Sequence, residues 1–557
     1  MASATFSDLP TELVVNVFAF IRQKKDQGVV CLVSRSWREL MAPILWEELE
    51  FSLGDHQGSS PGRSLTTLLD PNSGILPHVR NLCFADFTDE DAENRLESLI
   101  LALPRDKLRI FQAYGDMQHE LFLQLLRSQT KLEKFYAVTP FTCLGSTSDY
   151  HYASREYRAW VASLTPELKE ISLLLEREEE DEEEEVEKNH RNLQSFIDLY
   201  PSLERLNLSA DCDPPISLQE LLSLSPESRL FSNLTSIKME AMSLVPDALY
   251  QFSHNFDVAR LEKLHLKDCS SMSLFFDSLS ESYIETPGKL RELCIRLDNG
   301  VEDEVQVETT TSIENFLKVC CARLENLELH LSNGKLVDKS CLLPHAETLR
   351  NVIIEKSQYG IPDSQSHYYS GDEVGVILRA CTKLRGLAIN LPPIDLGHIT
   401  ELGDEFQFKA SERDCAAFKD VLAQCAAHPS LHTMEILSEP DITFSYDSET
   451  FEETPLMEER SFRASCEAAM KHFGDQIFSH MSQCGTVPRL LLVESFDTRD
   501  FEEGTPMEDH YFWPWYIHRR GNVGDNSGSN LLGAARDEME KTSRNYPGDF
   551  ILRRFSS

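Results

Sequence analysis

The sequence predicts an α/β protein. A small all-α module of three short helices precedes an α/β solenoid of repeated strand–helix units with a parallel sheet on its concave face. Three observations predict this fold. The first 46 residues contain short apolar segments with helical spacing, and L-x-x-L-x-L segments then recur, most of them behind an amphipathic helical pattern. In addition, 557 residues are too many for one compact core.

The N-terminal module is expected over residues 1–51. Pro10 suits the first position of a helix, because its missing N–H would have no partner there. Leu13, Val17 and Ile21 follow on one helical face. No basic region precedes this stretch and polar residues interrupt it, so it is not a signal peptide.

A third helix is expected to open at Ser36, because Glu39 three residues later completes a capping-box pattern. Pro43 is expected to end this helix. About 40 residues bury too little surface to be firmly stable alone. The module is therefore expected to pack against a partner or against the rest of the chain.

The residues of this module resemble an F-box. The match keeps the order and spacing of Leu9-Pro10, Glu12-Leu13, Leu32-Val33-Ser34-Arg35, Trp37-Arg38, Leu40, Pro43 and Leu45-Trp46. The resemblance implies docking on the Skp-type adaptor of a cullin–RING ubiquitin ligase. The adaptor-binding residues expected from it are Leu9, Pro10, Leu13, Val17, Phe18, Ile21, Leu32, Val33, Trp37, Leu40, Pro43, Leu45 and Trp46. The alternative is a helical cap on the following domain.

Residues 52–74 are rich in Gly, Ser and Pro and are expected to form a linker. The solenoid is expected over residues 75–495. Its strands are predicted to start near Val79, Leu108, Leu132, Leu168, Leu203, Leu234, Leu261, Leu290, Leu324, Leu349, Leu384, Leu431 and Leu491. Successive starts from Leu203 to Leu384 are 25 to 35 residues apart, which is near or above the period of leucine-rich repeats.

A module of this kind followed by such repeats resembles the leucine-rich-repeat class of F-box substrate receptors. The alternative is an ordinary α/β domain with parallel strands. In a solenoid, the residues between the leucines face the concave surface. They form a chemically mixed strip that suits a protein surface or peptide. The substrate-binding residues expected there are Arg205, Asn207, Lys263, His265, Glu292, Arg296, Asn326, Glu328 and His330.

Three further segments interrupt or end the repeats. The acidic run at about 176–189 is expected to be a disordered loop, because like charges at this density repel one another. It is either a solvated loop or an attractor for a basic partner. The segment at about 438–460 is expected to be an irregular loop, and residues 462–483 are expected to form a helix.

Residues 496–557 are expected to form a C-terminal cap and a flexible tail. An aromatic cluster lies beside two arginines there, and it suits either a cap on the open end of the solenoid or a partner-binding patch. Its members are Phe512, Trp513, Trp515, Tyr516, Arg519 and Arg520.

The composition restricts the partners. Fifty-three Lys and Arg against 92 Asp and Glu give a net charge of −39. This argues against nucleic acid and against an anionic membrane surface, which both need basic groups. The 14 cysteines include no C-x-x-C pair, and no apolar run is long enough to span a membrane. We therefore expect reduced thiols, no metal, and a cytoplasmic or nuclear location.

No catalytic motif is present, and no cofactor is expected. The sequence thus predicts a non-enzymatic substrate-recognition subunit of an SCF-type E3 ubiquitin ligase, whose N-terminal module binds the adaptor and whose repeats bind an unidentified protein substrate. One alternative is a leucine-rich-repeat scaffold or inhibitor without a ligase role. Another is an enzyme in the irregular region 440–520.

Overall fold

The computed structural model of the chain describes residues 9–21, 24–52, 65–85, 90–116, 119–138, 163–176, 203–211, 215, 233–244, 257–297, 303–320, 323–331, 335–356, 368–402, 405–438, 440–445, 460–494, 515–520, 529–534, 539, 543 and 549–553. The chain forms two compact units, Met1–Phe275 and Phe276–Ser557. The division falls within helix α11 (Met272–Glu285). No described helix is long and apolar enough to cross a membrane.

Unit 1 begins with the three expected helices, α1 (Thr11–Ala19), α2 (Lys24–Val33) and α3 (Arg35–Leu45). The start and end of α3 differ from the prediction. Its cap is Ser34 rather than Ser36, since the Ser34 hydroxyl accepts a hydrogen bond of 3.1 Å from the Trp37 N–H. It also continues two residues past Pro43, because a proline in the last turn removes only one hydrogen bond of the helix.

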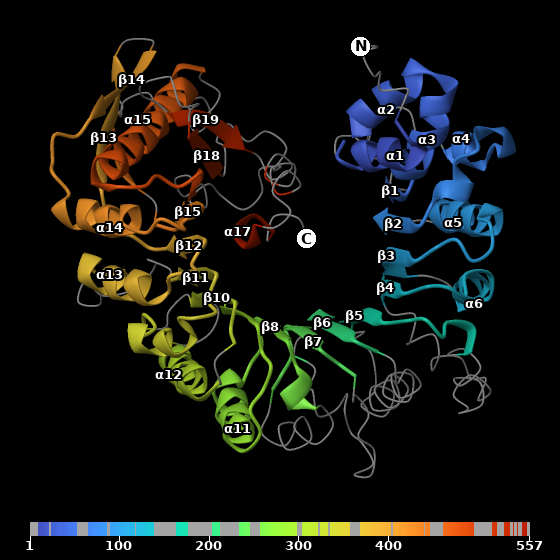
Figure 1. Cartoon of the computed structure of the whole chain (residues 1–557), viewed down its shortest axis with the longest axis horizontal. Helices are drawn as coiled ribbons and strands as arrows, with labels where there is room; N and C mark the ends of the chain where they lie inside the picture. Colours follow the sequence, from blue (N-terminus) through green and yellow to red (C-terminus); the bar gives the residue numbers. More distant parts are fainter. Residues whose placement is uncertain are drawn as a thin grey trace. The chain divides into compact units, whose positions relative to one another are not determined.

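The strands of unit 1 are all parallel, and each pairs with the next along the chain (Figure 1). They are β1 (Glu48–Ser52), β2 (Asn81–Ala85), β3 (Ile110–Asp116), β4 (Lys134–Val138), β5 (Glu170–Glu176), β6 (Arg205–Asp211), β7 (Ser236–Glu240) and β8 (Lys263–Lys267). Strand β1 directly follows the three-helix module and pairs with β2. The module is therefore continuous with the sheet.

Strand β8 shows why the repeated motif folds this way. Leu264 and Leu266 are buried, whereas Lys263, His265 and Lys267 between them are partly exposed. Side chains alternate between the two faces of a strand, so the leucines form the core and the polar residues line the other face. Helices α5 (Glu90–Ala102) and α6 (His119–Ser128) lie beside β2 to β4 (Figure 1). We call the polar face, opposite the helices, the inner face.

The segment predicted as a linker is partly structured. It contains helix α4 (Leu65–Leu69) and a 3₁₀ turn over Pro71–Ser73. Asp70 caps this turn by accepting a hydrogen bond of 2.9 Å from the Asn72 N–H. The Gly, Ser and Pro content therefore correctly indicated the turn at Pro71–Ser73, but it gave no sign of the short helix α4.

In unit 2, parallel strands again pair in chain order, and two antiparallel strands follow them. The parallel strands are β9 (Glu292–Leu297), β10 (Asn326–Leu331), β11 (Asn351–Glu355), β12 (Gly386–Ile389), β15 (Thr433–Ile436) and β17 (Leu490–Glu494). The antiparallel strands are β18 (Trp515–Arg520) and β19 (Ser529–Ala534).

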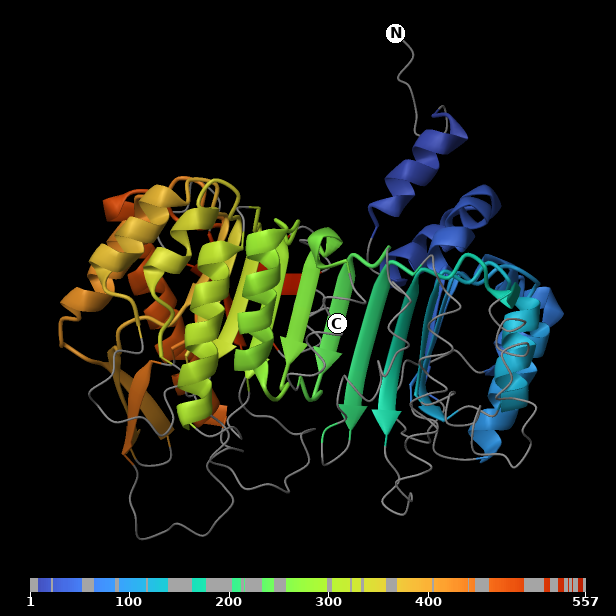
Figure 2. The ribbon, with the colours of Figure 1, turned by 90° about the horizontal axis from the view of Figure 1, so that it is seen from below.

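The helices of unit 2 between these strands are α11, α12 (Asp303–Val319), α13 (Gly371–Ala380) and α14 (Ala416–Ala426). They lie side by side over one face of the parallel strands, in yellow-green to orange in Figure 2. Helix α13 starts with a reciprocal capping box between Ser370 and Glu373. The fold is thus a three-helix module followed by leucine-rich-repeat-like α/β units, and this prediction is confirmed.

All thirteen predicted repeat strands are present, from β2 to β12 together with β15 and β17. Several other predictions fall outside the described residues. These are most of the acidic run at 176–189, and Phe512 and Trp513 of the aromatic cluster. The backbone of the remaining cluster residues forms β18, but the side chains of Trp515, Tyr516, Arg519 and Arg520 are not described.

The loop predicted at 438–460 is wrong for its first residues. Strand β16 (Asp441–Ser445) lies there and pairs with β13 (Asp395–Leu402), which also pairs with β14 (Glu405–Ala410) in a separate three-stranded sheet. Helix α15 (Arg460–Cys484) covers this sheet, and Cys466 packs between Ile399 and Phe406. The sequence D-I-T-F-S was too short to reveal a strand whose partner lies more than 40 residues earlier.

Candidate functional site

The three-helix module has its own apolar core. It consists of Val14, Phe18, Cys31, Met41 and Leu45, with Ile21, Trp37, Leu40 and Trp46 packed around it. The rings of Phe18 and Trp37 meet edge to face with centroids 5.3 Å apart. Six of the predicted adaptor-binding residues therefore form or pack against this core, two of them buried and four partly buried. They are Phe18, Ile21, Trp37, Leu40, Leu45 and Trp46.

The other seven predicted adaptor-binding residues are exposed. They are Leu9, Pro10, Leu13, Val17, Leu32, Val33 and Pro43. Sequence reasoning missed Phe20 and Val29, whose side chains are 78% and 56% exposed. Their helical spacing could have revealed both, because Phe20 lies seven residues after Leu13 and Val29 lies four residues before Val33.

This concentration of exposed apolar residues is unusual in the molecule. Among the described residues twelve large apolar side chains are exposed, and seven of them lie in the first 33 residues. We call these seven the apolar strip: Leu9, Leu13, Val17, Phe20, Val29, Leu32 and Val33. On and beside α1 and on α2 they recur at three- and four-residue intervals, so each helix presents one apolar face. A patch of this kind marks an interaction site.

Polar contacts hold α2, one of the two helices that carry the strip. Lys24 Nζ donates to the carbonyl oxygen of Leu45 at 2.9 Å and Arg38 Nε donates to that of Cys31 at 3.2 Å. These bonds link both ends of α2 to α3. The exposed residues are thus presented by a preformed scaffold.

On the inner face of unit 1, the structure brings together four of the predicted substrate-binding residues. Arg205 and Lys263 occupy the same row across β6 to β8, and Asn207 and His265 occupy the next row. Asn207 Nδ2 donates to Ser172 Oγ at 2.7 Å. The four predicted residues therefore lie on adjoining strands of one surface.

Glu170 is the central carboxylate of this face. It is 7% exposed and accepts contacts from Lys134 at 2.7 Å and Arg205 at 2.6 Å. Burial alone would raise the pKa of Glu170, but the hydrogen bonds and charges of Lys134 and Arg205 outweigh burial and lower it. Glu170 therefore stays ionised and its charge is already neutralised. Sequence reasoning missed Glu170 and Lys134.

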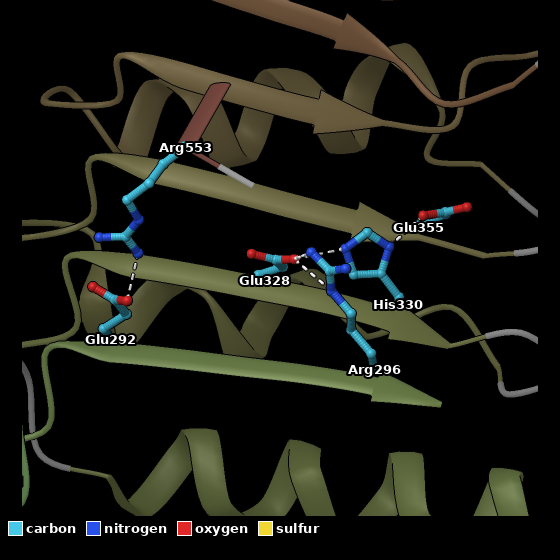
Figure 3. Close-up of polar contacts among 6 residues, drawn as sticks. All are labelled: Glu292, Arg296, Glu328, His330, Glu355 and Arg553. Carbon is cyan, nitrogen blue, oxygen red and sulfur yellow. Dashed lines mark hydrogen bonds and ion pairs between the residues drawn. The ribbon is translucent and has the colours of Figure 1, made fainter. Parts of the chain in front are cut away.

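On the inner face of unit 2, the other predicted residues bind one another. Arg296 donates to Glu328 Oε1 through Nε at 2.9 Å and Nη2 at 2.5 Å, and His330 Nε2 lies 2.9 Å from the same oxygen (Figure 3). The second ring nitrogen of His330 contacts Glu355, which sequence reasoning missed. Glu328 is only 5% exposed. These groups are therefore largely satisfied within the protein.

The electrostatics of this cluster follow from burial and pairing. Burial alone would raise the pKa of Glu328, but His330 and Arg296 lower it far below its usual range. Burial alone would lower the pKa of His330, whereas its hydrogen bonds to Glu328 and Glu355 raise it. The opposite shifts describe a mutually stabilised ionic cluster.

The C-terminal helix α17 (Phe550–Arg553) lies on the inner face of unit 2, against β11 and β12 (Figure 1). Its residues Phe550, Ile551 and Leu552 are buried in one cluster with Ile353. Arg553 Nη2 donates to Glu292 at 2.5 Å (Figure 3). The predicted substrate residue Glu292 is 3% exposed and is therefore covered by the chain's own C-terminal helix.

Asn326 completes this row. Its amide nitrogen lies 3.4 Å from Glu292 Oε2, and its amide oxygen accepts a hydrogen bond of 2.7 Å from Asn351. Asn326 is thus a link in a ladder across β9 to β11. The predicted residues of unit 2 therefore contact one another or α17, and Glu292 and Glu328 among them are buried.

The described cysteines are free thiols. Burial raises the pKa of Cys269, Cys425 and Cys466 to about 12. The reactive form of cysteine is the thiolate, so these three thiols are poor nucleophiles at neutral pH. Within the described part of the chain, no group of three or more His, Cys, Asp and Glu residues could hold a metal ion.

These features define a class of protein: an F-box-like helical module with an exposed apolar strip, followed by leucine-rich-repeat-like α/β units. Comparison with known families agrees for the first part, because residues 6–52 match the family model described as F-box-like. No curated protein matches the chain.

Two solved structures are similar to the chain. One is the leucine-rich repeat-containing protein LegL7 from Legionella pneumophila, with 14% identity and a TM-score of 0.30 over 48% of this chain and 97% of LegL7. The other is the Rad7 and Elc1 complex in yeast, with 13% identity and a TM-score of 0.34 over 81% of this chain and 97% of the matched chain.

Proposed function

We propose that the three-helix module docks on a Skp-type adaptor, so that the chain is the substrate-recognition subunit of an SCF-type cullin–RING ubiquitin ligase. The repeats would bind the target protein. The apolar strip carries the proposal. Its seven side chains are exposed although the module already has a filled core.

The energetics favour a partner on this strip. Fully burying one leucine or phenylalanine side chain contributes about 1.5–3 kcal/mol. Phe20 and Leu32 are 78% and 77% exposed and have most of this contribution still available. Side chains of the module core hold α1 and α2 in place, so little ordering free energy is lost when an adaptor binds.

The mechanism of such a subunit is proximity. Holding a target beside a ligase-bound ubiquitin conjugate raises the effective concentration of its lysine side chains. This chain would contribute binding and orientation, and the chemistry would belong to its partners.

A second candidate is a leucine-rich-repeat scaffold whose first module serves as an end cap. One observation favours it: β1 follows α3 directly and pairs with β2, so the module is joined to the repeats as a cap would be. A cap, however, has no use for an apolar strip that faces solvent. Adaptor binding distinguishes the two candidates.

The test compares adaptor binding by the full chain and by the variant Leu13→Ala/Leu32→Ala. These side chains are 49% and 77% exposed, so their truncation should leave the fold intact. Interface residues of this kind carry much of the binding free energy, and we expect affinity for a purified Skp-type adaptor to fall at least about tenfold. Calorimetry or surface plasmon resonance would measure it.

The matched control is Leu101→Ala/Ile284→Ala, which removes two apolar side chains of similar exposure (62% and 67%) outside the module. It should bind the adaptor like the wild type. A wild-type chain that fails to bind, or equal losses in both variants, would refute the proposal and favour the scaffold.

A further inference from the structure

Basic side chains gather on one part of the inner face of unit 1, over β4 to β8, although the whole chain has a net charge of −39. Five basic residues lie on β4 and β6 to β8, and we call them the basic strip: Lys134, Arg205, Lys238, Lys263 and Lys267. Two carboxylates, Glu170 and Glu240, lie among them. Among these seven residues the basic groups outnumber the carboxylates by three, and two further acidic residues, Glu176 and Asp211, end β5 and β6.

The strand register places these groups side by side. In one row Lys134, Glu170, Arg205, Ser236 and Lys263 are successive partners across β4 to β8. Two and four residues further along the strands, Lys238 pairs with His265 and Glu240 pairs with Lys267. Since residues two apart share a face, all of these positions lie on the inner face.

Each carboxylate is held between two basic groups. Glu170 contacts Lys134 and Arg205, while Glu240 lies 2.5 Å from Lys267 and 3.5 Å from Lys238. Burial alone would raise the pKa of Glu240, but the two lysines lower this pKa. Glu240 is therefore ionised, and the two lysines neutralise its charge. The side chains of Arg205, Lys238 and Lys267 are still 46%, 49% and 44% exposed. Positive charge therefore remains open to solvent.

The inner face of unit 2 does not have this property. There the buried Glu328 pairs with the partly exposed His330, and Arg553 of α17 reaches the buried Glu292. Unit 1 thus offers the inner face whose polar groups are more accessible. The excess charge of its basic strip is opposite in sign to the net charge of the chain.

The kind of cation indicates the kind of anion. Recognition of a phosphate group favours an arginine whose guanidinium fork is available for two parallel hydrogen bonds. The one arginine of the strip, Arg205, already donates to Glu170 at 2.6 Å. The other four residues are lysines, which act as separate point charges on β4, β7 and β8. This arrangement suits several separate carboxylates better than one phosphate.

We propose that the basic strip binds an extended, Asp/Glu-rich segment of a protein partner. This proposal rests on the proposed function, and it specifies the chemical class of the target that the repeats recognise. Strands lie about 4.8 Å apart, so β4 to β8 span about 19 Å. An extended peptide covers about 3.4 Å per residue, and about six residues therefore cross the strip.

The experiment measures how two fluorescein-labelled peptides of about 12 residues bind to the full chain. In the acidic peptide Glu alternates with Ser, and in the neutral peptide Gln replaces each Glu. The adaptor is absent, so failure of adaptor docking cannot affect the result. We expect the acidic peptide to bind and the neutral peptide not to bind. Affinity should fall by about tenfold or more between 50 and 300 mM salt, because salt screens exposed charges. A second version of the chain has Gly and Ser at residues 178–187, which removes its own acidic run as a competitor.

The decisive variant is Lys238→Gln/Lys267→Gln, and we expect it to weaken binding of the acidic peptide at least tenfold. Its matched control is Lys131→Gln/Lys169→Gln, which removes the same charge just before β4 and β5 and should bind like the wild type. Equal loss in both variants would attribute binding to net charge and overturn the proposal. So would absence of binding, a preference for the same peptide carrying phosphoserine in place of Glu, or tighter binding of a 12-nucleotide single strand.

Discussion

His330 shows how one residue can depend on both of its neighbours. One ring nitrogen lies 2.9 Å from Glu328 and the other contacts Glu355. Both ring nitrogens can donate only in the imidazolium form, and the raised pKa of His330 agrees with that form. The cluster is therefore an ion pair extended over β10 and β11.

We expect His330→Gln to lower the free energy of unfolding by about 1–3 kcal/mol, because the buried Glu328 and the partly exposed Glu355 lose a charged partner. The loss should depend on pH. A histidine pKa raised by folding contributes stability that is complete below the unfolded value of about 6.5 and disappears as pH rises through the folded value. The loss should thus be larger at pH 6 than at about pH 9–10. Urea unfolding at both pH values measures it.

The partner substitution provides the control. Glu355→Gln should also destabilise the protein at pH 6, and the double variant should lose less than the sum of the two single losses, since the residues are in contact. Losses that add, or a loss from His330→Gln that is the same at both pH values, would contradict an imidazolium at this position.

At the scale of a single helix, the start of α3 separates two serines that look equivalent in sequence. Ser34 accepts a hydrogen bond from the Trp37 N–H, whereas Ser36 lies within the helix. Ser34→Ala should therefore lower the stability of the module by about 1 kcal/mol, as expected for loss of an N-cap. Ser36→Ala should have little effect or a slightly favourable one, because alanine is the better helix former.

Hydrogen exchange of the α3 amides would measure this local stability without requiring unfolding of the rest of the chain. Faster exchange in Ser34→Ala but not in Ser36→Ala is the expected result. The reverse order would show that Ser36 and Glu39 form the cap after all, as the S-x-x-E pattern predicts.

The elements differ in how far the sequence could reveal them. Repeated leucines mark β2 to β12, β15 and β17, because each strand buries its leucines against neighbours a few tens of residues away. Strands β13, β14 and β16 have no such repeat, and their pairing depends on contacts between distant segments. Helix α17 has only four residues, and its position against β11 and β12 could not be read from so short a segment.

In the candidate surfaces, too, the sequence reveals what depends on local pattern and misses what depends on distant contacts. Alternation along a strand predicts that Arg205 and Glu292 share the polar face of the repeats. It does not predict that Arg553, 261 residues later, covers Glu292. Helical spacing likewise finds the exposed Leu13, but it cannot tell that Phe18 fills the module core. Local pattern gives the direction of a side chain, and only the tertiary fold gives its neighbours.

At the scale of the whole molecule, net charge and local charge have opposite signs. The chain carries −39, and self-repulsion at such a charge destabilises a compact state. The basic strip is a local exception whose excess charge attracts anions. Added salt screens both effects, with a Debye length of about 10 Å at 0.1 M. One change of conditions should therefore act in opposite directions on stability and on ligand binding.

We expect the melting temperature to rise between about 20 and 200 mM NaCl, by a few degrees if screening contributes about 1 kcal/mol. Over the same range, affinity for the acidic peptide should fall. Differential scanning calorimetry measures the first effect, and KCl at equal concentration should reproduce it if screening is the cause. A melting temperature that falls with salt would show that ion pairs such as those of Glu170 and Glu328 outweigh the repulsion between the remaining acidic groups. In that case the unpaired acidic side chains would have to lie so far apart that water and counterions already screen their repulsion at low salt.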